Sequence, residues 1–245
     1  MRLIIEPSVA VITPTIGENN LTQAIDSVKK QTYKNITHII VVDGPEYLER
    51  ARKIVPYNVL LTVTPENTGG SGYYGHRIYA GYPHLINQDF IAFLDEDNWW
   101  NENHVDSLVS KIQTKNLDWS YSLRKVYVDD EYLADDCCES IGRWPIFFSQ
   151  DDNPQYLVDT SSYMFKKEFL IQVCQHWHHG WGGDRRFFSI ITQVLKHDNY
   201  DTTGLHTLNY RLPDMQKAYG GDMKFFDKGN EVIRKKYQGI YPWQK

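Results

Sequence analysis

The chain has 245 residues, of which 41% are hydrophobic and 23% are charged, and this length can bury a substantial core. The formal net charge is −5 and there is no basic run, so the sequence offers no electrostatic footprint for nucleic acid. The three cysteines form neither a disulfide framework nor a zinc-binding pattern, which favours a reducing, cytoplasmic compartment. No stretch approaches the length of a membrane-spanning helix, so we expect no membrane span.

The first half of the chain alternates short apolar runs with helical patterns. The apolar runs are rich in β-branched and aromatic residues, as is typical of buried strands. We predict strands at residues 9–13, 37–42, 59–63 and 90–94, and helices at 21–31, 47–54, 73–85 and 102–115. This alternation predicts an α/β fold with a mixed, mostly parallel sheet that carries helices on both faces.

The second half of the chain is less regular. We predict one strand or two short strands at residues 119–128, helices at 166–175 and 184–196, and a strand at 206–211. A soft boundary near residue 118 divides the chain into residues 1–117 and 118–245, which we expect to be two halves of a single compact domain, 1–245.

Polar or acidic residues follow three of the four predicted strands. The carboxyl ends of such strands form one edge of the sheet, where open α/β sheets bind their ligands. We therefore expect these residues to gather along that edge: Thr13, Pro14 and Thr15 after the first strand, Asp43 after the second, and Asp95, Glu96 and Asp97 after the fourth.

The acidic triplet after the fourth predicted strand has the spacing of a metal site. Asp95 and Asp97 are two residues apart, so both carboxylates can reach one hard cation. Mn²⁺ and Mg²⁺ prefer oxygen ligands and also bridge the oxygens of a diphosphate. We predict a site for one of these two cations at this strand end.

Taken in order, the motifs of the chain resemble those of the family 2 glycosyltransferases of the GT-A type. The similarity covers about the first 115 residues closely and continues in shorter pieces through the second half. The motifs are VITPT at 11–15, VVDG at 41–44, ENTGG at 66–70 before His76 and Arg77, FLDED at 93–97, VDTSS at 158–162, GGDRR at 182–186 and TLNYR at 207–211.

The resemblance implies a Rossmann-like GT-A fold and a transfer reaction. A sugar would move from a nucleotide diphosphate sugar, with UDP favoured, to an acceptor hydroxyl with inversion and with Mn²⁺ or Mg²⁺ as cofactor. Residues 1–117 would bind the donor and residues 118–245 the acceptor, which is a glycan, a lipid-linked molecule or another hydroxyl compound. Whether the protein forms a homo-oligomer is left open by the resemblance.

The resemblance also implies roles for matched residues. The nucleotide would contact Thr13, Pro14, Thr15, Asp43, His76, Arg77, Asp95 and Glu96, with Asp43 at the base and His76 and Arg77 near the ribose or diphosphate. Asp97 would bind the metal directly, with Asp95 beside it and His206 as a third ligand. Asp184 would be the general base that deprotonates the acceptor hydroxyl. The family's usual Glu-Asp pair at this position is Gly183-Asp184 here, and its second acidic residue after the second strand is Gly44.

Four further residues are candidates for contact with the donor or acceptor sugar: Trp99, Asp159, Trp181 and Gly183. Of Trp99 and Trp100, we expect one to pack in the core and the other to border the sugar pocket. Asp159 would bond a sugar hydroxyl or cap the next helix. In the segment 176–181, a loop that presents Trp177 or Trp181 to the acceptor, plain aromatic packing and a histidine metal site all remain open.

Two other kinds of protein share parts of this pattern. A sugar-nucleotide nucleotidyltransferase needs a Gly-rich, basic loop after the first strand, whereas residues 13–18 have one glycine and no Lys or Arg. A non-catalytic sugar-nucleotide or glycan-binding module differs chiefly in lacking a base such as Asp184. A glycoside hydrolase would need two carboxylates around a sugar without a nucleotide pocket.

The acidic pairs 135–136 and 151–152 are predicted to be solvated loop charges.

Overall fold

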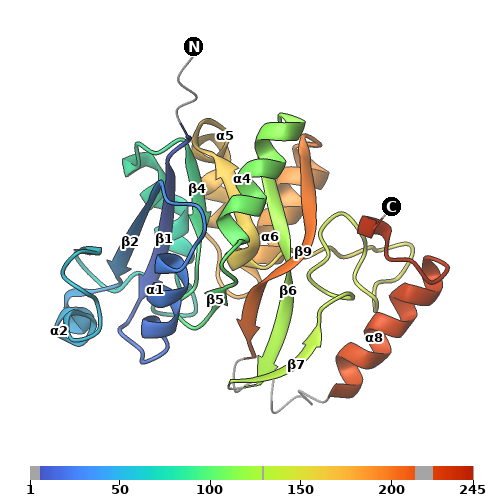
Figure 1. Ribbon diagram of the computed structural model, residues 1–245, viewed down its shortest axis with the longest axis horizontal. Coiled ribbons are helices and arrows are strands. Elements are labelled where there is room, and N and C mark those ends of the chain that lie inside the picture. The colour runs from blue at the N-terminus through green and yellow to red at the C-terminus, as the bar shows by residue number, and fades with distance from the viewer. Residues whose placement is uncertain (1–5, 129, 213–222, 245) are drawn as a thin grey trace.

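A computed structural model describes residues 6–128, 130–212 and 223–244 (Figure 1). The strands are β1 Val9–Thr15, β2 Ile36–Val42, β3 Leu60–Val63, β4 Phe90–Phe93, β5 Trp99–Trp100, β6 Trp119–Val128, β7 Glu131–Asp135, β8 Tyr163–Lys166 and β9 Tyr200–Arg211. The α-helices are α1 Leu21–Lys29, α2 Leu48–Arg52, α3 His76–Gly81, α4 His104–Lys115, α5 Lys167–Val173, α6 Gly183–Ser189 and α8 Met223–Lys236. None of the described helices is long and apolar enough to cross a membrane.

One continuous sheet runs through both halves of the chain. Its strand order is β3-β2-β1-β4-β8-β6-β9-β5, with β7 paired to β6. The first four strands are parallel, while β8 pairs antiparallel with both β4 and β6 and so joins the two halves. The predicted α/β class, mixed sheet and single domain are confirmed, and the boundary near residue 118 falls just before β6 inside that sheet.

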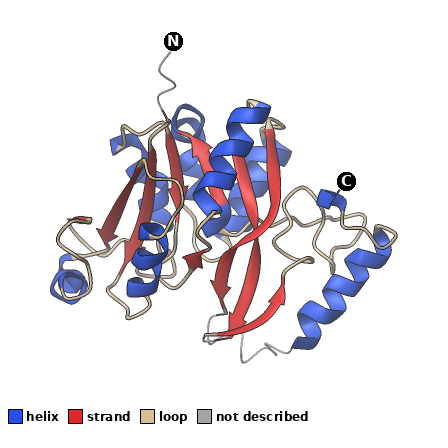
Figure 2. Ribbon diagram, in the orientation of Figure 1, coloured by secondary structure: helices blue, strands red, loops and turns tan. Residues whose placement is uncertain are grey.

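Helices cover both faces of the sheet because the strands are apolar on both sides. Along β1, Ala10 and Ile12 pack toward α3, α5 and α6, whereas Val9 and Val11 pack toward α1 and α4. All four of these side chains are fully buried. Figure 2 shows the helices in blue against the red sheet, with α8 apart at the right. Burial on both faces is what parallel strands in α/β folds require.

The predicted helix at residues 73–85 is shorter in the structure. Helix α3 ends at Gly81, and the 3₁₀ turn Tyr82–Leu85 follows it. Pro83 lies in that turn, and a proline cannot donate the backbone hydrogen bond that would continue an α-helix.

Much of the aromatic content fills the core. Trp119 stacks on Tyr200 with ring centroids 4.1 Å apart, and Trp177 stacks on Phe187 at 4.4 Å. The sequence leaves three alternatives open for the segment 176–181. Trp177 is fully buried, so for this residue aromatic packing is the correct one, and its side chain does not face an acceptor. Stacked pairs of this kind add to the stability that area burial alone provides.

His104 begins α4 in the core without a charge partner. Its ring stacks on Trp100 at 4.2 Å, its Nδ1 lies 2.8 Å from the hydroxyl of Thr207, and its Nε2 has no hydrogen-bond partner. Burial lowers the pKa of His104 to about 3. The folded protein therefore holds this imidazole neutral at pH values where the unfolded chain protonates it.

This difference predicts a loss of stability on acidification. A histidine whose pKa is lower in the folded than in the unfolded state contributes stability that is lost as pH falls below its unfolded pKa of about 6.5. From pH 7 to pH 5, His104 should account for about 2 kcal/mol of that loss. In His104→Gln, unfolding free energies from denaturant titration should therefore fall by about 2 kcal/mol less between these pH values than in wild type. An identical pH dependence in the two proteins would refute the neutral, buried state of His104.

Candidate active site

A cavity of about 590 Å³ opens at the carboxyl ends of the parallel strands. Its lining takes residues from the ends of β1, β2 and β4 and from the second half of the chain, including the first turn of α6 and the end of β9. Of the predicted site residues, it brings together Pro14, Thr15, Asp43, His76, Asp95, Glu96, Asp97, Asp159, Trp181 and Asp184. The predicted convergence of three strand ends on one edge is therefore present.

Asp95 lines the cavity and is held by two neighbouring hydroxyl groups. The Tyr79 hydroxyl donates to its Oδ1 at 2.6 Å, and the Ser161 hydroxyl donates to its Oδ2 at 3.2 Å. Burial and the nearby charge of Asp159 raise the pKa of Asp95 to about 7. This carboxylate is oriented before any ligand arrives.

Asp97 differs from Asp95 because no side chain in the described part of the structure donates a hydrogen bond to it. Burial and the charges of Asp95 and Glu96 raise its pKa to about 7. A recessed carboxylate without a donor favours an incoming cation, since the cation would relieve both its desolvation and its repulsion by neighbouring carboxylates.

Glu96 holds the turn that follows β1. Its carboxylate accepts hydrogen bonds from the Thr15 hydroxyl and from the backbone N–H groups of Ile16, at 3.1 Å, and Glu18, at 3.0 Å. The Thr15 hydroxyl in turn accepts from the N–H of Gly17 at 2.8 Å. Glu96 therefore shapes the wall of the cavity, which is a structural task that the sequence did not indicate.

The prediction that Thr13 lines the nucleotide pocket is wrong. Strand β1 continues to Thr15, so Thr13 lies inside the strand, fully buried, with its hydroxyl 3.0 Å from Nε2 of His38. The cavity wall is formed instead by Pro14, Thr15 and Ile16.

Asp43 holds the segment that follows β3 by hydrogen bonds. Its carboxylate accepts from the backbone N–H and the hydroxyl of Thr68, each at 2.7 Å, and from the N–H of Gly69 at 2.7 Å. Asp43 still lines the cavity, so base recognition remains a prediction. Its removal would loosen residues 66–70 in any case, because three donors lose their acceptor.

His76 and Arg77 have different environments. His76 lines the cavity, whereas the guanidinium of Arg77 lies over the ring of Tyr73, 3.6 Å from its centroid, and donates to the carbonyl of Thr68 at 3.2 Å. Arg77 is absent from the cavity lining, so the predicted nucleotide contact of Arg77 is corrected to a structural role in the segment 66–77.

Asp184 lies in the first turn of α6 and lines the same cavity as Asp43. Its Oδ1 accepts from the backbone N–H of Arg185 at 2.8 Å. Gly182, two residues before Asp184, has a φ of 77°, a left-handed conformation that glycine adopts without strain. Trp181 is 72% exposed at the cavity mouth, while Gly183 is buried against His76 and lies outside the lining, which corrects its predicted sugar contact.

Arg124 is the main feature that the sequence did not reveal. From β6 it donates to Asp136 at 2.8 Å, Asp159 at 2.8 Å and Glu139 at 2.6 Å, and Glu139 also pairs with Arg185 at 2.8 Å. Asp136 is fully buried, so its predicted solvated state is wrong. Asp159 is committed to Arg124 and to the N–H of Ser161, although it also lines the cavity.

Trp99 and His206 lie away from the cavity. Trp100 is buried in the core as predicted for one of the pair, but Trp99 packs on Tyr127 at 4.6 Å and is absent from the lining. His206 sits in the middle of β9 with its Nε2 3.6 Å from the sulfur of Cys137. Neither the predicted sugar contact of Trp99 nor the predicted metal ligation by His206 agrees with these positions.

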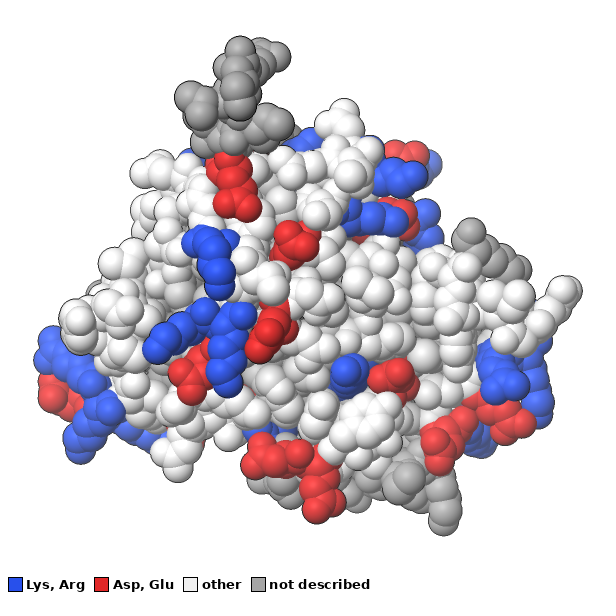
Figure 3. All heavy atoms as spheres, viewed as in Figure 1, with Lys and Arg blue, Asp and Glu red and all other residues white. Residues whose placement is uncertain are grey.

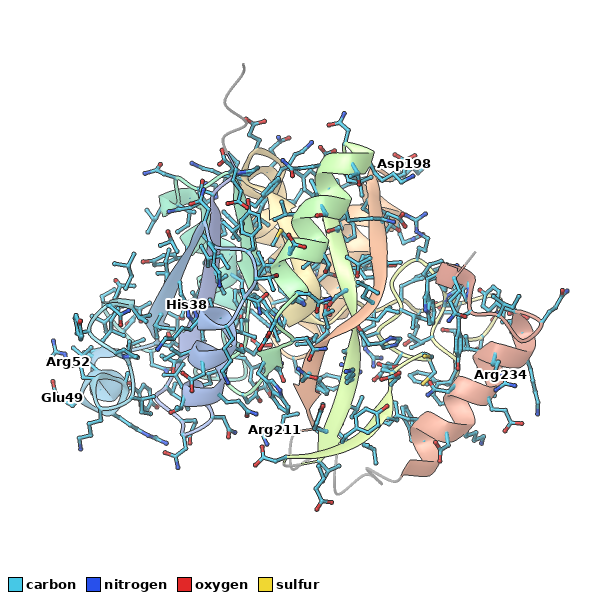
Figure 4. The ribbon with its side chains drawn as sticks, in the orientation of Figure 1. His38, Glu49, Arg52, Asp198, Arg211 and Arg234 are labelled. Carbon is cyan, nitrogen blue, oxygen red and sulfur yellow. The ribbon has the colours of Figure 1, made fainter. Side chains whose placement is uncertain are left out.

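Arg211 instead brings the end of β9 to the site. Its Nε donates to the backbone carbonyl of Asp97 at 3.3 Å, and its guanidinium lies 5.1 Å from the ring of Trp99. Figure 4 labels Arg211 at the lower end of β9. Arg211 is the last residue of the TLNYR motif at 207–211, and this motif was the feature of the sequence that could have indicated its place in the site.

The cavity carries an excess of negative charge. Its lining includes seven carboxylates, from Asp43, Asp95, Glu96, Asp97, Glu139, Asp159 and Asp184, against three guanidinium groups, from Arg124, Arg185 and Arg211. On the face drawn in Figure 3, by contrast, acidic and basic side chains are interspersed. A diphosphate would need added positive charge to enter such a cavity.

The donor set fits a divalent cation that is shared with a ligand. No group of three or more His, Cys, Asp or Glu side chains in the described ranges could hold a metal by itself. Magnesium typically takes one or two protein carboxylates and completes its shell with substrate phosphates and water. Asp97 and Asp95 fit that arrangement without a third protein ligand.

Solved structures share this fold. A fragment of S. aureus TarS, residues 1–349, superposes with a TM-score of 0.59 at 15% identity over 83% of this chain and 60% of that one. The same fragment in complex with UDP-GlcNAc gives 0.57 at 14% identity over 93% and 64%. The fold is therefore GT-A.

Sequence comparison then identifies the family. The model "Glycosyl transferase family 2" matches residues 10–173, so the chain belongs to this family. Glycosyltransferase GlyA of Streptococcus pneumoniae is 28% identical over 120 residues, which span 45% of this chain but only 16% of that protein. An uncharacterized glycosyltransferase of Rickettsia prowazekii is 23% identical over 252 residues, 95% of this chain and 76% of that one.

The Arg124 network predicts a large effect on stability. In Arg124→Met the carboxylates of Asp136, Asp159 and Glu139 would lose their shared cation while still buried, which typically costs about 3–5 kcal/mol. Arg52→Met is the matched control, because Arg52 pairs with Glu49 on exposed α2 (Figure 4), where such a pair is worth less than about 1 kcal/mol. Denaturant unfolding would contradict the account if the two variants were equally stable.

Proposed function

We propose that this protein transfers a sugar from a UDP-sugar to an acceptor hydroxyl, with inversion and with Mn²⁺ or Mg²⁺. The observation that carries the proposal is one acidic cavity that joins Asp43, the Asp95–Asp97 strand end and Asp184. Membership in glycosyl transferase family 2 supports the reaction class, and the TarS fragment, whose fold this chain shares, was crystallised with UDP-GlcNAc.

The donor would lie between the ends of β1, β2 and β4. Asp43 and the segment 66–70 would border the nucleotide, and Asp97, with Asp95 beside it, would hold the divalent cation. When bound, that cation supplies positive charge that stabilises the departing nucleoside diphosphate. Arg211, which also pairs with Asp130, lies next to Asp97 and would add positive charge on this side of the cavity.

Asp184 would take the proton of the acceptor hydroxyl. As the O–H bond breaks toward this carboxylate, the acceptor oxygen bonds to the anomeric carbon, and the bond from that carbon to the diphosphate oxygen breaks. Attack from the side opposite the leaving group inverts the anomeric centre. Asp184 and Asp97 line the same cavity and come from different halves of the chain, so a base and a leaving-group site can act on one sugar there.

Exposed aromatic side chains near Asp184 favour a carbohydrate acceptor. Trp181 is 72% exposed, and Phe148 is 45% exposed with the Arg185 guanidinium 6.0 Å from its ring centroid. Aromatic faces of this kind can stack on a sugar ring, and the surrounding carboxylates can accept hydrogen bonds from its hydroxyls. Lipid-linked acceptors, self-association and cytoplasmic location stay predictions from the sequence.

The turn after β1 argues against the nucleotidyltransferase alternative. A triphosphate needs free backbone N–H groups and basic side chains at such a turn. Here the carboxylate of Glu96 already accepts from the N–H groups of Ile16 and Glu18, so this turn presents negative charge.

A base role for Asp184 predicts a specific kinetic defect. Asp184→Asn keeps the size of the side chain and removes its basicity, and a positioned base contributes about 10²–10⁴-fold in rate. The rate of UDP release from a panel of UDP-sugars with Mn²⁺ should fall by about that factor, while UDP affinity measured by calorimetry stays unchanged.

Asp152→Asn is the matched control, since Asp152 is an exposed loop carboxylate outside the cavity lining, and it should release UDP at the wild-type rate. Equal rates in Asp184→Asn and wild type would rule out the base role, leaving this side chain only its hydrogen bond from the Arg185 N–H in the first turn of α6, which the Asn amide oxygen can also accept.

A further inference from the structure

Two segments that lie far apart in the sequence pack directly against each other beside the cavity. We define the donor loop as residues 66–76 and the base loop as residues 176–184. Gly69, Gly70, Tyr74 and His76 of the donor loop line the cavity, as do Trp181, Gly182 and Asp184 of the base loop. Contacts between these loops can therefore connect the donor side of the site with its base.

His76 makes the central contact between the loops. Its Nδ1–H donates to the backbone carbonyl of His179 at 2.7 Å. On the same ring, a Cβ built on Gly183 would lie only 2.6 Å from Cε1 and 2.7 Å from Nδ1. The residue before Asp184 therefore has to be glycine for the base loop to sit this closely on His76.

Further contacts surround this hydrogen bond. Tyr73 packs on His178 with ring centroids 5.4 Å apart, and a Cβ on Gly180 would come within 3.2 Å of the carbonyl oxygen of Gly72. His76 also packs on buried Trp177 at 5.7 Å, which anchors the start of the base loop in the core.

The other side of the donor loop is tied to the proposed nucleotide site. Asp43 accepts from Thr68 and Gly69, and Arg77 joins the carbonyl of Thr68 to the ring of Tyr73. A continuous series of contacts thus runs from the end of β2 through the donor loop to the residue next to Asp184.

We propose that His76 is a positioning residue that seats the base loop on the donor loop, so that a ligand ordering the donor loop also orders Asp184. The inference rests on the proposed function for the identity of that ligand and of the base, but the contact itself does not depend on either. Gly182, with a left-handed φ of 77°, turns the chain between His179 and Gly183, so that both residues contact the His76 ring. The two loops are coupled because ordering the donor loop lowers the entropic cost of ordering the base loop.

Hydrogen–deuterium exchange of the full chain, first without nucleotide, tests the contact. His76→Ala should speed amide exchange in residues 176–184 about fivefold, the effect of losing one hydrogen bond of ordinary strength. His76→Asn keeps a side-chain N–H donor and should retain slow exchange. His84→Ala removes a histidine of the Tyr82–Leu85 turn whose Nε2 lies 3.4 Å from the sulfur of Cys174, two residues before the base loop. It controls for the loss of a nearby imidazole and should leave exchange in the base loop unchanged.

Gly183→Ala separates the proposed contact from a general loss of packing. The added methyl would push the His76 ring off the His179 carbonyl, so it should speed exchange in the wild-type background and add nothing in His76→Ala. Additive effects of the two substitutions, or unchanged exchange in His76→Ala, would overturn the proposal.

Addition of UDP with Mn²⁺ tests the coupling. In wild type and His84→Ala, UDP with Mn²⁺ should slow amide exchange both in residues 66–70 and in residues 176–184. In His76→Ala, exchange should still slow in residues 66–70 but no longer in residues 176–184. Protection of both loops in His76→Ala would overturn the coupling. Protection of neither loop in wild type would refute the proposed donor, and the comparison without nucleotide would still decide the role of His76.

Discussion

Seven carboxylates share the lining of one cavity, and their mutual repulsion is the constraint around which the rest of the site is organised. Two of them, Glu139 and Asp159, share the guanidinium of Arg124 with Asp136, which is buried outside the lining, and Glu96 accepts hydrogen bonds from backbone N–H groups. Asp43 is occupied in the same way by Thr68 and Gly69. Asp97 is left with a raised pKa and no side-chain donor among the described residues, so the remaining charge is concentrated where a cation would be most stabilising.

The sheet explains why this charge gathers in one place. Parallel pairing of β1 with β2 and β4 aligns the carboxyl ends of three strands, so residues more than fifty positions apart become neighbours. The antiparallel strand β8 then lies against β4 and positions Ser161, which bonds Asp95, and Asp159. Asp184 completes the cavity from α6, whose start follows Trp181 and Gly182. Each half of the chain supplies an incomplete site, and their junction in one sheet completes it.

The sequence predicted the parallel half of the fold because apolar runs and helical segments alternate there with clear periodicity. It predicted Asp43 and Asp95–Asp97 correctly as cavity residues because the ends of β2 and β4 lie close to where their apolar runs stop. It misplaced Thr13 and His206 because β1 and β9 extend further than their apolar cores, which leaves both residues inside strands. The burial of Arg124 and Asp136 could not be predicted, although the two lie only 12 residues apart at the β6–β7 hairpin, because nothing local distinguishes a buried arginine in a strand from a solvated one.

The central claim is that Asp97 holds a divalent cation that the donor diphosphate shares. The most direct test is isothermal titration calorimetry of UDP into wild type and Asp97→Asn, each with Mn²⁺ and with a chelator. The account predicts that Mn²⁺ strengthens UDP binding by at least about tenfold in wild type, a difference of about 1.4 kcal/mol, and has no effect in Asp97→Asn. Equal UDP affinity with and without Mn²⁺ in wild type, or an undiminished Mn²⁺ effect in the variant, would contradict it.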